Sequence, residues 1–157
     1  MNTLSFENTV KKIAQGANSS GSIVVDFEDY NGWCIKTEDD DTVYLVMSGE
    51  KCRFPDQAAL DAIFNSRDIH DGTSIVGRLW TSLVEQMPTG PDISEGAQLM
   101  RADNEPGVFL LTNRKKYGIT SEDQFNSCNF SWKKIHVYPK IIIDSIPDGG
   151  NHAFDRP

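Results

Sequence analysis

The residue group with the most enzyme-like chemistry is Asp68-Ile69-His70-Asp71. A carboxylate beside a histidine can orient the imidazole, which then serves as a general base or a metal ligand near neutral pH. The group lies in a polar stretch that predicts a loop, and loops carry many functional residues. Asp71-Gly72 is also a common turn sequence, and Asp68 suits a helix cap. A structural role for His70 is therefore the simpler expectation. A hydrolase or nuclease-like enzyme using Asp68, His70 and Asp71 is therefore the alternative hypothesis.

The remaining chemistry-bearing residue types form no recognisable motif. His136 and His152 have no triad spacing, and the twelve glycines form no phosphate loop, dinucleotide fingerprint or nucleophile elbow. The three cysteines are widely spaced and contain no C-x-x-C pair, which argues against a disulfide framework and against a zinc site. We therefore predict buried thiols, no metal and no cofactor.

A second candidate is a concentration of carboxylates near the start of the chain. Between residues 26 and 71 there are twelve acidic and four basic residues, so this third of the chain accounts for the whole formal net charge of −8. Residues 112 to 140 instead carry six basic and two acidic residues. This uneven distribution of charge affects association with other molecules rather than the fold. A negative region repels the phosphates of double-stranded nucleic acid.

Aromatic side chains flank part of this acidic segment. Tyr30 and Trp33 stand on either side of Asn31-Gly32, and aromatic residues are enriched at the centres of protein interfaces. The simpler reading is that the acidic residues only solvate loops and that the tryptophans belong to the core. The predicted partner-binding residues are Asp26, Glu28, Asp29, Tyr30, Trp33, Glu38, Asp39, Asp40 and Asp41.

Several elements must position these residues. Alternating apolar residues from Ser22 to Tyr30 predict a strand, and Asn31-Gly32 is the dipeptide preferred in a type I′ hairpin turn. Strands over 33–37 and 42–47 would complete a three-stranded antiparallel meander whose second corner carries Glu38 to Asp41. Before it, the apolar spacing of residues 4–14 predicts a helix.

The rest of the chain predicts helices followed by strands. Pro55 suits the start of a helix over 55–65, apolar spacing predicts another over 75–84, and Asp92 with Glu95 resembles the capping box of a third, reaching Ala102. Residues 108–112 have the continuous apolar character of a central strand. Further expectations are a short helical turn near Ser121 and Gln124, a strand over 128–133, and an edge strand or bulge within 135–143, where Pro139 cannot donate to a ladder.

Together these elements predict one α+β domain over residues 1–144, with a largely antiparallel sheet packed by three to four helices. Pro147, Gly149, Gly150 and Pro157 suggest that residues 145–157 form a loosely ordered tail. No apolar run is long enough to cross a membrane, and residues 1–16 lack the pattern of a signal peptide. Because the cysteine spacing argues against a disulfide framework, this points to the cytoplasm.

The leading hypothesis is a small acidic cytosolic protein-binding module. It would act as an inhibitor or neutralising partner, of the immunity or anti-defence type, by occluding the basic surface of a target protein. A structural or assembly component without a ligand of its own is a third possibility. Single-stranded nucleic acid contacting the basic segment near Phe130, Trp132 and Tyr138 is a further, weaker one.

Overall fold

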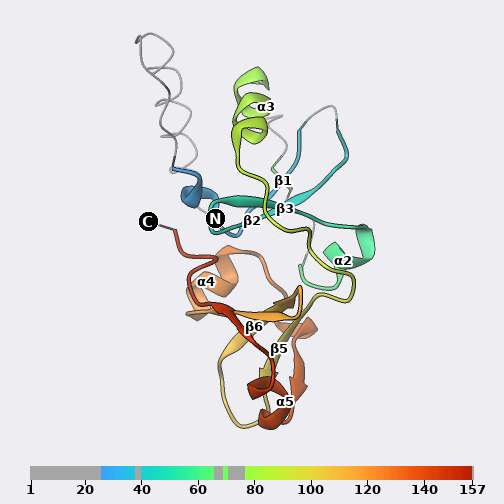
Figure 1. Cartoon of the computed structure of the whole chain (residues 1–157), viewed down its shortest axis with the longest axis vertical. Coiled ribbons are helices and arrows are strands. Elements are labelled where there is room, and N and C mark those ends of the chain that lie inside the picture. Colours follow the sequence, from blue (N-terminus) through green and yellow to red (C-terminus); the bar gives the residue numbers. More distant parts are fainter. Residues whose placement is uncertain (1–25, 38–39, 66–68, 71–76, 157) are drawn as a thin grey trace.

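The computed structural model describes residues 26–37, 40–65, 69–70 and 77–156. They form an α+β structure of two sheets that are stacked along the long axis of the molecule (Figure 1). The predicted fold class is therefore confirmed. Among the described residues there are four α-helices and two short 3₁₀ helices.

The first sheet has the strand order β3-β2-β1-β4. Its strands are β1 (Cys34–Ile35), β2 (Tyr44–Met47), β3 (Glu50–Arg53) and β4 (Ile69–His70). β1, β2 and β3 are antiparallel neighbours, as a meander requires, whereas β4 runs parallel to β1. A meander thus exists, but it uses β3 where the sequence suggested a strand before Tyr30.

The second sheet has the strand order β8-β5-β6-β7-β9. Its strands are β5 (Gln98–Ala102), β6 (Val108–Thr112), β7 (Lys115–Ile119), β8 (His136–Tyr138) and β9 (Asp148–Gly150). The pairs β5–β6 and β6–β7 are antiparallel, and the two outer strands are parallel to their neighbours. β6 is the central strand that its apolar run predicted, and β8 is the expected edge strand.

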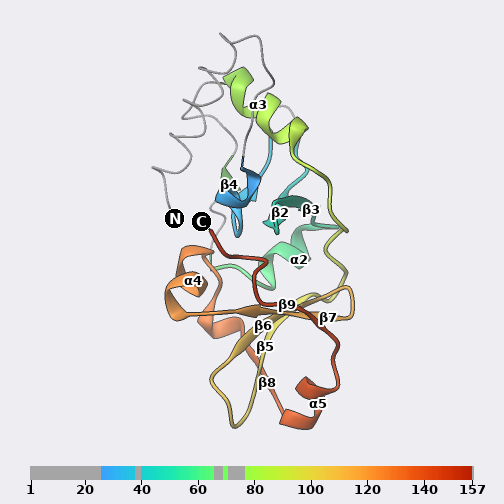
Figure 2. The ribbon, with the colours of Figure 1, turned by 60° about the vertical axis from the view of Figure 1, so that its left-hand side comes forward.

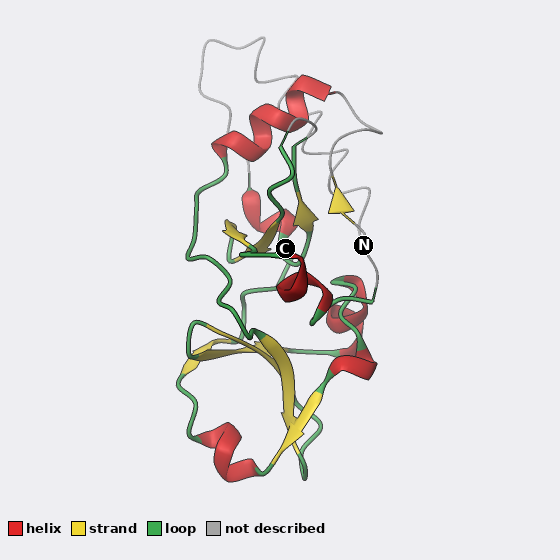
Figure 3. Cartoon of the chain, turned by 90° about the vertical axis from the view of Figure 1, so that its right-hand side faces the viewer, coloured by secondary structure: helices red, strands yellow, loops and turns green. Residues whose placement is uncertain are grey.

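The helices lie around and between the sheets. They are α2 (Gln57–Asp61), α3 (Gly77–Gln86), α4 (Glu122–Ser127) and α5 (Lys140–Asp144). α3 lies at one end of the molecule and α5 at the other, while α2 and α4 lie between the sheets (Figures 2 and 3). The helix predicted over 75–84 is confirmed from Gly77 onward, and residues 75–76 lie outside the described residues. The cap at Ser121, whose Oγ accepts from Gln124 N at 3.0 Å, is also confirmed.

One apolar core joins the two sheets. Side chains of β2 and β3 meet side chains of β5 and β6 there, and Phe125, Phe130 and Phe154 fill the space between them. A second core packs Trp80 and Leu83 of α3 against the first sheet. The second sheet is also covered on its opposite face, where Met100 and Ile143 are buried.

Three predicted elements are wrong. Residues 27–30 are a 3₁₀ helix, η1 (Phe27–Tyr30), rather than the end of a strand. Residues 98–102 are β5 rather than the end of a helix beginning at Asp92, and residues 132–134 are a 3₁₀ helix, η2 (Trp132–Lys134), rather than strand. The predicted helix over 4–14 lies outside the described residues.

The C-terminal segment is packed rather than loose. β9 pairs with β7, and Ala153 and Phe154 are buried in the core shared by both sheets. Ser48 N donates to the carbonyl of Ala153 at 2.9 Å, which attaches this segment to the first sheet. The proline and glycine content that suggested a tail instead allows the chain to turn into and out of β9.

Candidate binding site

Tyr30 and Trp33 are not available as surface anchors. Their exposed fractions are 0% and 3%, and their rings meet edge to face at a centroid distance of 5.1 Å. Trp33 N donates to the Tyr30 carbonyl at 2.9 Å, which closes a tight turn and directs both rings into the core beneath α3. The suggestion that they contact a partner is therefore wrong.

Asn31-Gly32 forms this turn, but not as type I′. Asn31 has φ −51° and ψ 130°, and Gly32 has φ +87°, which are close to the values of a type II turn. The hairpin turns with positive φ at both central residues are elsewhere, at Ser48-Gly49 and Asn113-Arg114. Residues 26–30 consequently do not fold back as a strand on β1.

The first group of predicted acidic residues surrounds η1. Asp26 caps the helix, since its Oδ1 accepts from Glu28 N at 3.0 Å. Asp26 and Glu28 are exposed and Asp29 is half-buried. Glu28 lies against Gly49, which places this group beside the turn that follows β2.

The second group lies in the loop that precedes β2. Asp40 and Asp41 are exposed, and Asp40 Oδ1 accepts from Thr42 N at 2.9 Å. Hydrogen bonds from the Thr42 backbone and side chain lower the pKa of Asp40, so the carboxylate stays charged. Asp41 pairs with Lys36 at 3.5 Å. Glu38 and Asp39 lie outside the described residues.

The two acidic groups therefore do not share one corner. One adjoins the end of β2 and the other its beginning, so the sheet separates them. The predicted partner-binding carboxylates that the structure describes therefore form two separate surfaces rather than one. The loop with Asp40 and Asp41 borders a concave site.

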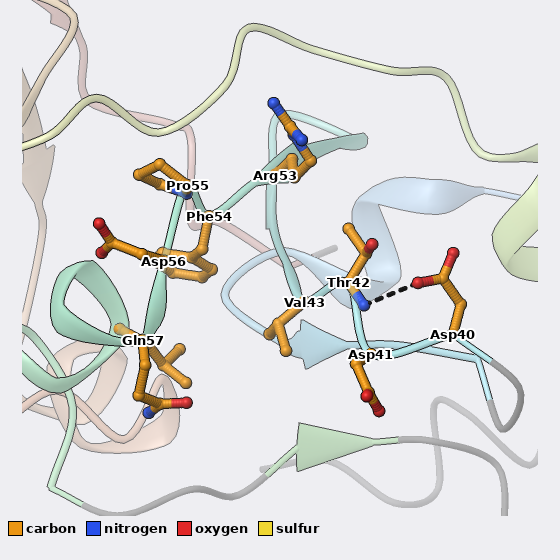
Figure 4. Close-up of a pocket in the computed structure, with 10 residues that line it drawn as sticks. Asp40, Asp41, Thr42, Val43, Arg53, Phe54, Pro55, Asp56 and Gln57 are labelled. Carbon is orange, nitrogen blue, oxygen red and sulfur yellow. Dashed lines mark hydrogen bonds between the residues drawn. The ribbon is translucent and has the colours of Figure 1, made fainter.

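That site is a groove of about 320 Å³ between the β1–β2 loop and the start of α2 (Figure 4). Val43, Phe54 and Leu60 supply its apolar lining. Asp56 adds a third carboxylate from the opposite side, where it caps α2 by accepting from Ala59 N at 2.9 Å. We refer to this feature as the acidic groove.

The one arginine that lines the acidic groove, Arg53, already has an ion-pair partner. Arg53 Nη2 binds Asp92 Oδ2 at 2.8 Å, and this hydrogen bond raises the pKa of the guanidinium. Asp40 and Asp56 have no ion-pair partner among the described residues, and the Lys36–Asp41 contact is long and exposed. The groove thus keeps an excess of negative charge.

The carboxylates do not converge as metal ligands do. In Figure 4, Asp40 and Asp41 point to opposite sides of their loop, and Asp56 points away from both. No group of three or more histidine, cysteine, aspartate or glutamate residues within the described part of the chain is arranged to hold a metal ion. A wide acidic rim over an apolar floor suits a long cationic side chain, whose stem and charged head need different surroundings.

Sequence reasoning missed Arg53, Phe54 and Asp56 as members of the site. Pro55-Asp56 before a helical pattern is a recognisable helix start, which locates Asp56 as the N-cap. Its position opposite Asp40 depends on β3 pairing with β2, a contact that the sequence did not reveal.

The structure does not show how the alternative catalytic residues, Asp68, His70 and Asp71, are arranged relative to one another. Asp68 and Asp71 lie outside the described residues. The backbone of His70 belongs to β4 and pairs with Ile35.

None of the helices in the described ranges is long and apolar enough to span a membrane. Comparisons with protein-family models, curated proteins and solved structures found no match.

Proposed function

We propose that this protein is a protein-binding module that acts as an inhibitor or neutralising partner by occluding a basic surface of a target protein, in the manner of an immunity or anti-defence protein. The observation that carries the proposal is the acidic groove, where Asp40, Asp41 and Asp56 border an apolar lining and Arg53 is paired with Asp92.

The groove has the chemistry to receive a lysine or arginine of the target. The aliphatic stem of such a side chain gains from contact with Val43, Phe54 and Leu60, and its charged head gains from the carboxylates on the rim. Rim charges mainly accelerate encounter, whereas contacts in the buried part slow dissociation. The activity of such a module is to exclude other ligands from the surface that it covers.

The state of the cysteines supports action in a reducing compartment such as the cytoplasm. Cys34, Cys52 and Cys128 are all buried, and no disulfide joins them. Cys34 and Cys52 lie on either side of Leu45 in the first sheet, two strands apart. Two strand spacings amount to roughly 9.5 Å, which is too far for a disulfide.

The test is recovery of bound proteins from native cell extract, followed by affinity measurements with the isolated partner. The variant is Asp40→Asn/Asp41→Asn, because asparagine at position 40 keeps an acceptor for Thr42 N. The matched control is Glu95→Gln/Asp103→Asn, which removes two exposed carboxylates from outside the groove.

We expect the groove variant to bind its partner about tenfold more weakly and with a shallower salt dependence, since two charges at an exposed rim contribute modestly each. The control should retain the affinity of the unmodified protein. Equal affinity and equal salt dependence for both double variants would refute the proposal.

A further inference from the structure

A second groove lies on the other sheet and shares no residue with the acidic groove. It has a volume of about 620 Å³ and is bordered by β8, α4 and the start of β6. Its apolar lining comes from Val108, Ile119, Phe125, Ile135 and Val137. We call it the β8 groove.

Its most prominent member is Trp132, which is 46% exposed yet held in place. The indole Nε1 donates to Asn126 Oδ1 at 2.8 Å, and the ring packs on Phe125 at a centroid distance of 4.0 Å. An aromatic side chain fixed in this way presents apolar area without losing conformational freedom on binding. Such residues are typical centres of recognition.

The second component is the strand edge beside the groove. Among the described strands, β8 pairs only with β5, and it lies at the border of the sheet (Figure 2). Asp103 N donates to the Tyr138 carbonyl at 2.9 Å, so Tyr138 directs its backbone groups toward β5. Because these directions alternate along a strand, the N–H and C=O of Val137 face outward, where another strand can bind them.

The third component is charge. Arg101 lines the groove beside Val137, its register partner on the neighbouring strand, and its Nη1 donates to the Ala102 carbonyl at 3.1 Å. No carboxylate forms an ion pair with Arg101 among the residues that the structure describes. Lys133, next to Trp132, is exposed, and Glu122 is the one acidic residue of the lining.

We infer that the β8 groove binds an extended peptide segment of a partner protein, which adds to the sheet at β8, places an apolar side chain against Trp132 and directs a carboxylate to Arg101. Peptides commonly bind in this way where an exposed edge strand adjoins side-chain pockets. The backbone of Val137 supplies the hydrogen bonds, and the groove selects the sequence.

The experiment uses the full chain and a phage-displayed library of random nine-residue linear peptides. Selected peptides are then synthesised with a fluorescent label and their affinity is measured by anisotropy. We expect selected sequences to combine apolar residues at alternate positions with at least one aspartate or glutamate. Absence of enrichment, or enrichment of basic sequences that lose affinity in Trp132→Ala, would overturn the inference.

Three variants test the three components. Val137→Pro removes the outward N–H at an edge position that tolerates proline, Trp132→Ala removes the ring, and Arg101→Gln removes the charge. Each should weaken binding about tenfold or more while the urea midpoint shows that the protein is still folded. If one variant fails to fold, the remaining two test the inference by the same measurement.

The controls lie close to the altered residues. Ile141→Ala removes a side chain that is 77% exposed and does not line the groove, so peptide affinity should be unchanged. Glu122→Gln removes a negative charge from the lining and should leave the affinity equal or higher. A weakening by these controls equal to that of the three variants would contradict the inference.

Two further measurements test whether the β8 groove binds something other than a peptide of a partner protein. A 12-residue oligouridylate that displaces the peptide and loses affinity in Trp132→Ala would show that the groove binds single-stranded nucleic acid. Light scattering that shows self-association, abolished by Val137→Pro, would show that a second copy of the chain occupies it. Either result would overturn the inference, whereas a monomer indifferent to the oligonucleotide supports it.

Discussion

The side-chain amide of Asn31 donates from Nδ2 to the carbonyl oxygen of Asp155 at 2.6 Å, across 124 residues of sequence. Its Oδ1 accepts from Gly49 N at 2.8 Å. Asn31 is 1% exposed, so one buried amide joins the turn after η1, the β2–β3 turn and the C-terminal segment. The arrangement explains how residues around 155 are fixed against the first sheet.

We therefore predict that Asn31→Ala lowers the free energy of unfolding by about 2–4 kcal/mol, because it removes two hydrogen bonds and leaves the buried Gly49 N–H unsatisfied. Urea denaturation measures the change. Gln86→Ala, on the exposed side of α3, is the control and should stay within about 0.5 kcal/mol of the unmodified protein. Similar values for the two variants would show that the amide does not join these segments.

Gly32 is required for two reasons that a pair of substitutions separates. It has φ +87°, and a Cβ at this position would lie 2.3 Å from Cys128 Sγ. Gly96 has φ +76°, but nothing lies within 4 Å of its Cβ position. Gly96→Ala should cost only the conformational strain of about 1–2 kcal/mol, whereas Gly32→Ala should cost roughly 1–3 kcal/mol more. Thermal denaturation compares them, and equal losses would exclude the steric contribution.

Residues 98–102 form β5 although the sequence predicted a helix there, and the burial of these residues explains the error. The spacing of Ile93, Ala97 and Met100 resembled a helix. Leu99 faces the core shared by the sheets, while Met100 faces the core beneath α5, so both neighbours are buried. A strand covered on both faces has no alternation to identify it. Residues 108–112 are also covered on both faces, but no polar residues before them resemble a capping box, so their apolar run predicted a strand.

Part of the predicted binding site is not at the surface, because local sequence patterns do not determine which side chains are buried. Tyr30 and Trp33 lie among charged neighbours in the sequence, yet α3, forty-odd residues later, covers both rings. Asn31-Gly32 supplied a positive φ as predicted, but only at the glycine. Conversely, the carboxylates at Asp40 and Asp41 were predicted from composition alone and are exposed, because a loop of consecutive acids has few ways to be buried.

The cysteines should be chemically inert in the folded protein. Burial raises the pKa of Cys52 to about 12 and that of Cys128 to about 11, so both stay as thiols at neutral pH. We expect a disulfide reagent to label neither residue at pH 8 within minutes, and to label both at once after denaturation. Rapid labelling of either in the native protein would show that its thiol is not buried in solution.

The same shifts predict loss of stability in alkali. In the unfolded chain these thiols ionise near pH 9, whereas in the folded protein they keep their protons until about pH 11 or 12. Between these limits the unfolded state binds fewer protons, so its stability relative to the folded state rises with pH. The free energy of unfolding should therefore decline from about pH 9 upward, and Cys52→Ala should make this decline shallower. An equally steep decline in Cys52→Ala would show that other groups cause it.

Asp56 allows the two roles of the acidic groove, stability and binding, to be separated. Its Oδ1 caps α2, and its charge belongs to the rim of the groove. Asp56→Ser keeps a capping oxygen but removes the charge, whereas Asp56→Ala removes both. We expect Asp56→Ala to lose about 1 kcal/mol of stability and Asp56→Ser little, while both weaken association with a basic partner to a similar extent. Urea denaturation and affinity measurements on the same two proteins check this. If partner affinity followed stability instead of charge, with Asp56→Ser binding as the unmodified protein does, the carboxylate at the start of α2 would be structural only, and the groove would depend on Asp40 and Asp41.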